Sequence, residues 1–302
     1  MNLFTFTAHF DSEQACRDHF KSERDKQGVT CKKCSHRSHY WKKDKQVYEC
    51  KKCRFRTSLR SGTIMENSNL PFLVWYLAMF LMSTTKKGLS AKEMQRQLGL
   101  KRYEPVWAMV HKLRKAMGNR DARYTLEGMI EMDEGYFTVS SSEIEQSKGK
   151  RGRGAAGKQN VMVSAESTPL EDLKTGKKSK QVRYFKAKVL TDHSADQVNE
   201  QIEKSFNEKA IVFTDKSTSY VDIADYVELH VTEKSTKVST AKTLRWVHIL
   251  IGNAKRNLLG NYHKIKGKYL QLYLNEFAYK LNRRYFGERL FDRVLVAAIT
   301  GV

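Results

Sequence analysis

The stretch Glu127–Phe137, EGMIEMDEGYF, decides the fold that we predict for this chain. Met129, Ile130 and Phe137 supply apolar and aromatic bulk, and the length and composition of the stretch favour a largely buried strand over a helix. Asp133 lies in its middle. A carboxylate inside an apolar strand is costly unless it is paired or bound to a metal ion. Asp133 is therefore a candidate functional residue.

A second apolar run, Ala210–Asp215 (AIVFTD), also delivers one carboxylate, at Asp215. Two strands that each carry an aspartate can build one site for divalent cations, because carboxylate oxygens are the ligands that Mg²⁺ prefers. This pairing is the central hypothesis. The alternative for either aspartate alone is an ordinary position at a strand end or turn, where aspartate is common.

The charge of the chain indicates its partner. Its 302 residues carry 55 Lys+Arg against 33 Asp+Glu, a formal net charge of +22. Such a charge attracts polyanions through counterion release, and nucleic acid is the leading candidate. A ribosomal or membrane-surface protein is the alternative. The sequence has no run of eighteen apolar residues and no signal-peptide pattern, so we expect no membrane partner and a cytoplasmic, nucleoid-associated location.

Two C-x2-C motifs form the strongest local signal. Cys31 and Cys34 are separated by fifteen residues from Cys50 and Cys53, and the segment between alternates like a hairpin. Four thiolates at this spacing predict a tetrahedral, structural Zn²⁺ site in a zinc ribbon, with no open position for catalysis. Two disulfides are the weaker alternative. Lysines and arginines surround the motifs, so we expect the ribbon to face phosphates.

Three helices are predicted after the ribbon. They span Leu70–Leu81, Ala91–Leu98 and about Tyr103–Met117, with Ser90 as the N-cap of the second and Gly99 at its end. Helix, short turn and helix fit a helix-turn-helix or a plain helical domain. The net charge favours DNA binding.

Further strands follow the Asp133 strand. A basic loop spans Ser140–Lys158 and is either a solvated loop or a clamp on DNA phosphates, with four candidate contacts: Lys150, Arg151, Arg153 and Lys158. Strands at Asn160–Glu166 and Val182–Leu190, a helix at Ser194–Phe206, the Asp215 strand and a short strand at Val227–Val231 complete the pattern. This order predicts an α/β core with a mixed five-stranded sheet.

A long helix, Leu244–Leu259, carries the candidate third group. His248 and Lys255 are seven residues apart, two turns along one face, whereas Asn253 falls on a different face. Helix geometry therefore favours His248 as the group aimed at the carboxylates, with Lys255 further out to hold a phosphate. A lone histidine on a helix is otherwise a structural residue.

Taken together, these residues resemble the ISXO2-like (IS1595-type) insertion-sequence transposases, DDE-type enzymes with a ribonuclease-H-like domain. The resemblance covers nearly the whole chain. It is carried by the four cysteines, Glu131–Glu134, the KRGRG loop, Thr214–Asp215, Tyr220 and a long tail motif: Lys255–Arg256, Gly260–His263, Lys268–Leu270, Tyr273–Phe277 and Leu281–Arg284.

The resemblance implies a two-metal phosphoryl transfer on DNA ends, with Asp133 and Asp215 holding Mg²⁺ or Mn²⁺. Many members carry Glu at the third position, where this chain has His248; others have an Asn/Lys pair, which points to Asn253 with Lys255. Glu276 is a further candidate carboxylate. Arg256, beside Lys255, is a candidate DNA contact.

We therefore expect three domains: an N-terminal helix and zinc ribbon (1–60), a helix-turn-helix-like DNA-binding domain (61–122) and a ribonuclease-H-like catalytic domain (123–302). The expected function is that of a transposase that binds the terminal inverted repeats of its element, cuts double-stranded DNA and joins it to target DNA. The resemblance implies a homo-oligomer, a dimer on paired ends. The alternative is a catalytically inactive DNA-binding regulator derived from a transposase.

Overall fold

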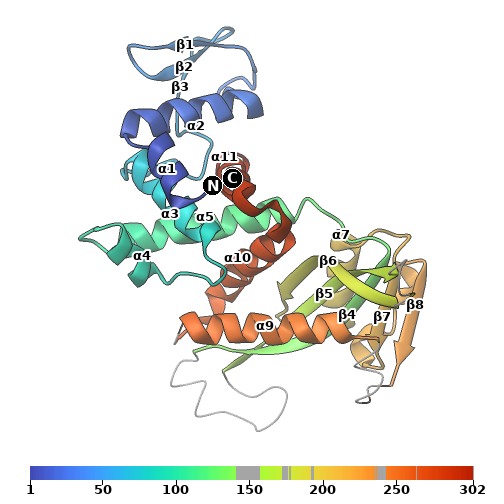
Figure 1. Cartoon of the computed structure of the whole chain (residues 1–302). Coiled ribbons are helices and arrows are strands. Elements are labelled where there is room, and N and C mark those ends of the chain that lie inside the picture. The colour runs from blue at the N-terminus through green and yellow to red at the C-terminus, as the bar shows by residue number, and fades with distance from the viewer. Residues whose placement is uncertain are drawn as a thin grey trace. The chain divides into compact units, whose positions relative to one another are not determined.

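The computed structural model of the chain describes residues 1–140, 157–171, 176, 178–191, 194–234, 236, 243–262 and 264–301. It divides into two compact units, Met1–Arg120 with Arg284–Val302, and Asp121–Arg283 (Figure 1). The three domains expected from the sequence stay a prediction, and residues 284–302 belong to the same compact unit as the N-terminal part of the chain.

The first unit begins with two short helices and a ribbon. Its elements are α1 (Leu3–His9), α2 (Glu13–Gln27), β1 (His39–Lys42), β2 (Val47–Cys50), β3 (Arg56–Ser58), α3 (Phe72–Thr84), α4 (Ala91–Gln97), most of α5 (Glu104–Asp121) and α11 (Leu290–Thr300). The sequence predicts one short helix within residues 1–28, capped by Asp11 or Ser12; α2 with its Ser12 cap confirms it, whereas α1 was not predicted. Asn2 caps α1 and Ser12 caps α2, each accepting a backbone N–H, so the chain breaks between them.

An aromatic cluster holds the helices of this unit together. Phe6 of α1 stacks on Phe80 of α3 with ring centroids 4.4 Å apart, and Tyr76 lies 5.7 Å from Phe291 of α11. Phe6, Tyr76 and Phe291 are all buried. The predicted cap of α4 is present, since Ser90 Oγ accepts from the backbone N–H of Glu93 at 3.1 Å. The helix ends before Gly99, whose φ of +63° suits glycine.

The second unit is built on the predicted five-stranded mixed sheet. Its elements are β4 (Met129–Thr138), β5 (Lys158–Glu171), β6 (Lys178–Val189), α7 (Ala195–Ser205), β7 (Ile211–Asp215), β8 (Leu229–Glu233), α9 (Arg245–Asn261) and α10 (Leu270–Asn282). The strand order is β6-β5-β4-β7-β8. β5 is antiparallel to both neighbours, and β7 is parallel to β4 and β8. The expected α/β, ribonuclease-H-like sheet is confirmed.

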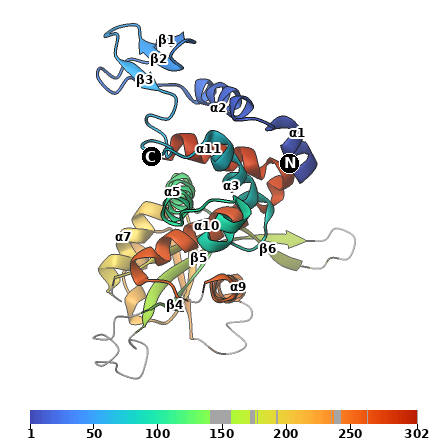
Figure 2. The same ribbon diagram turned by 90° about the vertical axis from the view of Figure 1, so that its left-hand side faces the viewer.

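Two apolar cores cover the two faces of the sheet. One joins Phe137, Val163 and Phe185 to residues of α9 and α10, and the other joins Ile130 and Met132 to residues of α7, among them Val198 and Ile202. Figure 2 shows α7 and α9 on opposite sides of the sheet. Because side chains alternate along β4, Glu131, Asp133 and Phe137 share the α9 face.

Helix α10 covers the edge strand β6 with side-chain amides. Asn282 accepts from the backbone N–H of Phe185 at 2.8 Å and donates to its C=O at 2.9 Å. Gln271 accepts from Val189 N–H at 2.8 Å and donates to Ala187 C=O at 2.9 Å. These bonds satisfy the outward backbone groups of the edge, which would otherwise be open to pairing with another strand. Two residues of the tail motif region therefore have a structural role.

Replacing Asn282 tests this account of the edge. Asn282→Ala leaves the buried N–H and C=O of Phe185 unpaired, and we expect the free energy of unfolding to fall by about 2–4 kcal/mol in urea denaturation. Asn261→Ala is the matched control, because the Asn261 amide bonds to Asn257 of its own helix. Equal losses in the two variants would contradict the edge role.

Candidate active site

The register of β4 and β7 brings the two predicted aspartates to the same level. The strands are parallel, with Met129 opposite Ile211 and Glu131 opposite Phe213. Two residues further on, the same register places Asp133 level with Asp215. Residues that are level in parallel strands point to the same face, so both carboxylates face α9. The proximity of the two carboxylates agrees with the electrostatics, since the charge of Asp215 raises the pKa of Asp133.

Asp133 is held between a backbone amide and a helix. Its Oδ1 accepts from the N–H of Glu134 at 2.7 Å, and its Oδ2 lies 3.5 Å from Nε2 of His248. Burial raises the pKa of the Asp133 carboxyl above its ordinary value, and Asp215 and Glu134 raise it further, whereas the Glu134 amide and His248 lower it. The carboxylate therefore carries a charge that its surroundings only partly compensate.

Asp215 presents an oxygen suited to a cation. Its Oδ1 is buried and accepts no hydrogen bond from the part of the chain that the structure describes. Tyr220 lies nearby and is buried; burial raises its phenol pKa, and the charges of Glu134, Asp133 and Asp215 add to the rise. The sequence reasoning gave Glu134 no role of its own, although its charge acts on Asp133 and Tyr220 and its carboxylate accepts from Asn160 at 2.6 Å.

Glu131 anchors α9 to the sheet beside the aspartates. It is fully buried, and its Oε2 accepts from the backbone N–H groups of Trp246 at 2.7 Å and Val247 at 3.2 Å. The helix has no side-chain cap at its own N-cap, Leu244, so the strand supplies the cap. Because Asp133 follows Glu131 by two residues and His248 follows Trp246 by two, this anchor sets His248 opposite Asp133.

Of the other predicted site residues, Lys255 lies on the same face of α9 as His248, whereas Asn253 and Lys158 lie elsewhere. Nζ of Lys255 lies 5.5 Å from the centre of the Phe137 ring, two turns beyond His248. Asn253 accepts from Arg256 at 2.5 Å on their own helix. Lys158 is exposed at the start of β5, opposite Thr138.

Glu276 and the basic loop residues do not join the two aspartates among the described residues. Glu276 is buried on α10, which packs on β6, and its carboxylate lies 3.8 Å from Lys280. Its helix therefore covers the far edge of the sheet, two strands from β4. The loop candidates Lys150, Arg151 and Arg153 lie outside the described residues.

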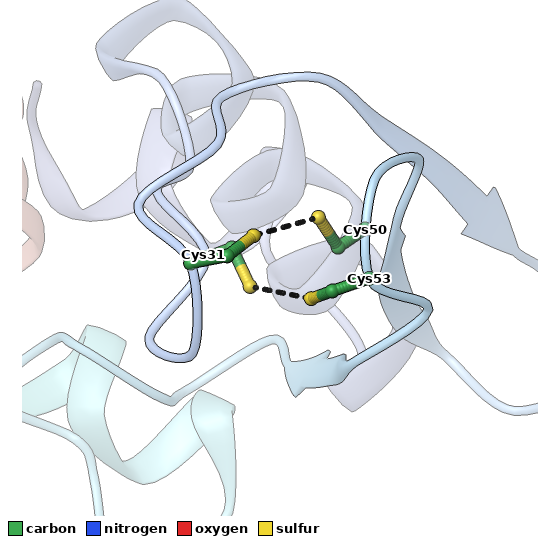
Figure 3. A group of neighbouring side chains, drawn as sticks. Cys31, Cys50 and Cys53 are labelled. Atoms are coloured by element: carbon green, nitrogen blue, oxygen red, sulfur yellow. Dashed lines mark hydrogen bonds between the residues drawn. The ribbon is translucent and has the colours of Figure 1, made fainter.

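The four cysteines of the ribbon converge. Their sulfur atoms lie within 4.8 Å of one another. Among the described residues, no other group of three or more His, Cys, Asp or Glu side chains is arranged so that it could hold a metal ion. Sγ of Cys31 and Sγ of Cys53 are 3.6 Å apart (Figure 3). Sγ of Cys34 and Sγ of Cys50 lie at the same distance. All five cysteines are free in this structure, and the convergence of four sulfur atoms on one point favours a shared metal site over two disulfides.

The two halves of the cysteine cluster have the same backbone geometry. The N–H of Cys31 donates to His36 C=O and that of Cys50 donates to Phe55 C=O, each at 2.9 Å. Ser35 and Arg54, the residues after each second cysteine, both have positive φ. Burial opposes ionisation of Cys50, yet backbone and thiol hydrogen bonds lower its pKa to about 7. This geometry is suited to the binding of one tetrahedral ion by the two C-x2-C turns.

The sheet order and paired strand aspartates place the second unit in the ribonuclease-H-like class. Comparison with known families agrees: the family described as the ISXO2-like transposase domain matches residues 125–282, more than half of the chain. The chain therefore belongs to the ISXO2-like transposase family. No curated protein matches the chain. Within the described residues, no helix combines the length and apolar character needed to cross a membrane.

The raised pKa of Asp133 makes a stability prediction. Because the folded-state pKa lies above the ordinary value, the ionised carboxylate opposes folding at neutral pH, and this penalty disappears at acid pH, where the group is protonated in both states. We expect Asp133→Asn, in the absence of divalent cations, to stabilise the protein by on the order of 1 kcal/mol at pH 7.

The measurement is thermal unfolding as a function of pH. The difference between Asp133→Asn and the parent should shrink as pH falls through the ordinary range of aspartate. Asp222→Asn, at an exposed position, is the control and should change stability little. A destabilised Asp133→Asn at neutral pH would show that the carboxylate is a structural partner.

Proposed function

We propose that the protein is a transposase that cuts the ends of its element and joins them to target DNA, with Asp133 and Asp215 as ligands of Mg²⁺ or Mn²⁺. The observation that carries the proposal is the pair of carboxylates on one face of adjacent parallel strands, with a buried oxygen of Asp215 that lacks a hydrogen bond from any described residue. Family membership supports the reaction class.

The donor set fits hard divalent cations, because both aspartates offer oxygen. When bound, two such ions would activate a water or a 3′-hydroxyl and stabilise the leaving oxygen. The chain's own residues do the positioning. Asp133 and Asp215 fix the ligand oxygens on the rigid centre of the sheet, and Glu131 holds α9 in place against them.

His248 is the best candidate for the third position, since its Nε2 lies 3.5 Å from Asp133. Asn253 is the weaker candidate because its oxygen accepts from Arg256, and Glu276 because its helix lies over β6. Imidazole is a softer donor than carboxylate and suits Mg²⁺ poorly, which favours Mn²⁺ if it binds the ion directly. Lys255, further along α9, would hold a flanking phosphate.

The N-terminal unit would hold double-stranded DNA. Four thiolates within 4.8 Å suit a structural Zn²⁺, which would fix the ribbon. Basic residues surround it, and Arg54 and Arg56 lie 3.6 and 3.2 Å from Glu49 of β2. The helices α3 to α5 are the proposed helix-turn-helix-like part, and a homo-oligomer would pair two element ends.

Two rival functions are separated by one assay. A DNA-binding regulator would bind the terminal inverted repeats without cutting them, and a simple nuclease would cut without joining. We expect the parent protein to cut and join a labelled element end with Mn²⁺ or Mg²⁺. Asp133→Asn and Asp215→Asn should each lower both rates by at least about a thousandfold, several kcal/mol of transition-state stabilisation.

The control for this assay is Asp222→Asn, which removes an exposed carboxylate of the same unit. It should cut and join like the parent. Full activity in both Asp133→Asn and Asp215→Asn would reject the metal site.

Metal analysis tests the ribbon. We expect one zinc ion per chain, lost in Cys31→Ser because three thiolates no longer close the tetrahedron. Cys16→Ala is the control, since Cys16 lies outside the cluster. Retention of zinc in Cys31→Ser would contradict the assignment of the four ligands.

A further inference from the structure

The segment Lys264–Lys268, KIKGK, is fastened to the far end of β4. The backbone N–H of Ser140 donates to Ile265 C=O at 2.7 Å, and Ser140 pairs with Lys266 in a parallel bridge. Ile265 is buried in the core under α9. Gly267 packs so closely on Gln159 that an added Cβ would lie 3.0 Å from its amide. We call this segment the lysine strap.

The lysine strap presents a row of cations on a fixed backbone. Lys264, Lys266 and Lys268 are exposed and alternate with the buried Ile265 and with Gly267. Lys268 lies 5.0 Å from the centre of the Tyr269 ring. Because the Ser140 backbone hydrogen bond and the burial of Ile265 fix the backbone of the strap, its charges occupy a defined position relative to the aspartates.

The lysine strap follows a series of contacts between β4 and α9. Glu131 contacts the start of α9, Asp133 faces His248, Gly135 lies against Ile251 and Phe137 against Lys255. The helix therefore runs parallel to β4 on its face, and the chain leaves it to form the strap. Seven residues of extended chain separate Asp133 from Ser140, at most about 23 Å.

We propose that the lysine strap binds the phosphate backbone of the DNA duplex about six or seven base pairs from the bond that is cut. The inference rests on the proposed function, which places the cut bond at Asp133 and Asp215. Duplex DNA rises about 3.4 Å per base pair, so 23 Å corresponds to this spacing. Lys255 lies between the two points and would contact the phosphates between them.

The test compares two double variants that remove the same charge. Lys264→Gln/Lys266→Gln alters the strap. Lys188→Gln/Lys209→Gln is the control: both lysines are exposed, Lys188 lies on the α7 side of the sheet beside Glu200, and Lys209 precedes β7. Binding to an element end is measured without divalent cations across a range of salt concentrations, with thermal unfolding as the check on folding.

We expect the strap variant to lower the slope of log K against log salt by about 1.8, the value for two lost phosphate contacts, and the control to keep the parent slope. Ethylation of phosphates about six or seven base pairs inside the outer end of the repeat should weaken binding by the parent and the control but not by the strap variant. Equal slopes for the two variants, or an unchanged ethylation pattern in the strap variant, would overturn the proposal.

These outcomes are independent of catalysis. A protein that binds in this way but neither cuts nor joins would reject the proposed function and leave the DNA contact standing. A protein that cuts and joins while the strap variant binds like the parent would reject the strap alone.

Discussion

The parallel pairing of β4 with β7 is the constraint on which the candidate site depends. It holds two carboxylates, from residues 82 positions apart in the sequence, level on one face of a rigid sheet. Two like charges at a half-buried position repel each other and lose hydration, as the raised pKa of Asp133 shows. Such an arrangement opposes folding unless a cation or a proton compensates it. A divalent cation is the compensation that would also make the pair catalytic.

The second constraint is the docking of α9, which is fastened near both ends. Glu131 caps its first turn, and the segment after its last turn pairs with Ser140. Four strand residues from Asp133 to Phe137 span about 13 Å, and seven helix residues from His248 to Lys255 span about 10.5 Å. These two lengths are similar, so side chains that are paired between α9 and β4 stay paired along the helix. The helix can therefore present successive side chains to successive phosphates of the same DNA.

Local pattern was sufficient to predict much of this. An apolar stretch with Asp133 in its middle predicted β4, and one that ends in Asp215 predicted β7. The cysteine spacing predicted the ribbon, and the seven-residue spacing placed His248 and Lys255 on one face of a helix that faces Asp133. Each of these features is encoded within a short stretch of sequence, where it can be read from the periodicity or the spacing of the residues.

The remaining features depend on contacts between distant residues, which a single sequence does not express. Glu131 looked like one more polar residue of a strand, and its role as the cap of α9 depends on a partner 115 residues away. Asn282 likewise belonged to a recognisable motif, but its bonds to Phe185 reach across 97 residues. Helix α1 was not predicted because it is only seven residues long and two of its residues are threonines, which are weak helix formers.

The most direct test of the central claim is the position of bound manganese in crystals of the protein, located by anomalous scattering at the manganese edge. The account predicts a manganese peak within coordination distance of carboxylate oxygens of both Asp133 and Asp215, separate from a zinc peak among the four cysteines. A structure in which manganese binds elsewhere, or in which the two carboxylates face opposite sides of the sheet, would contradict it.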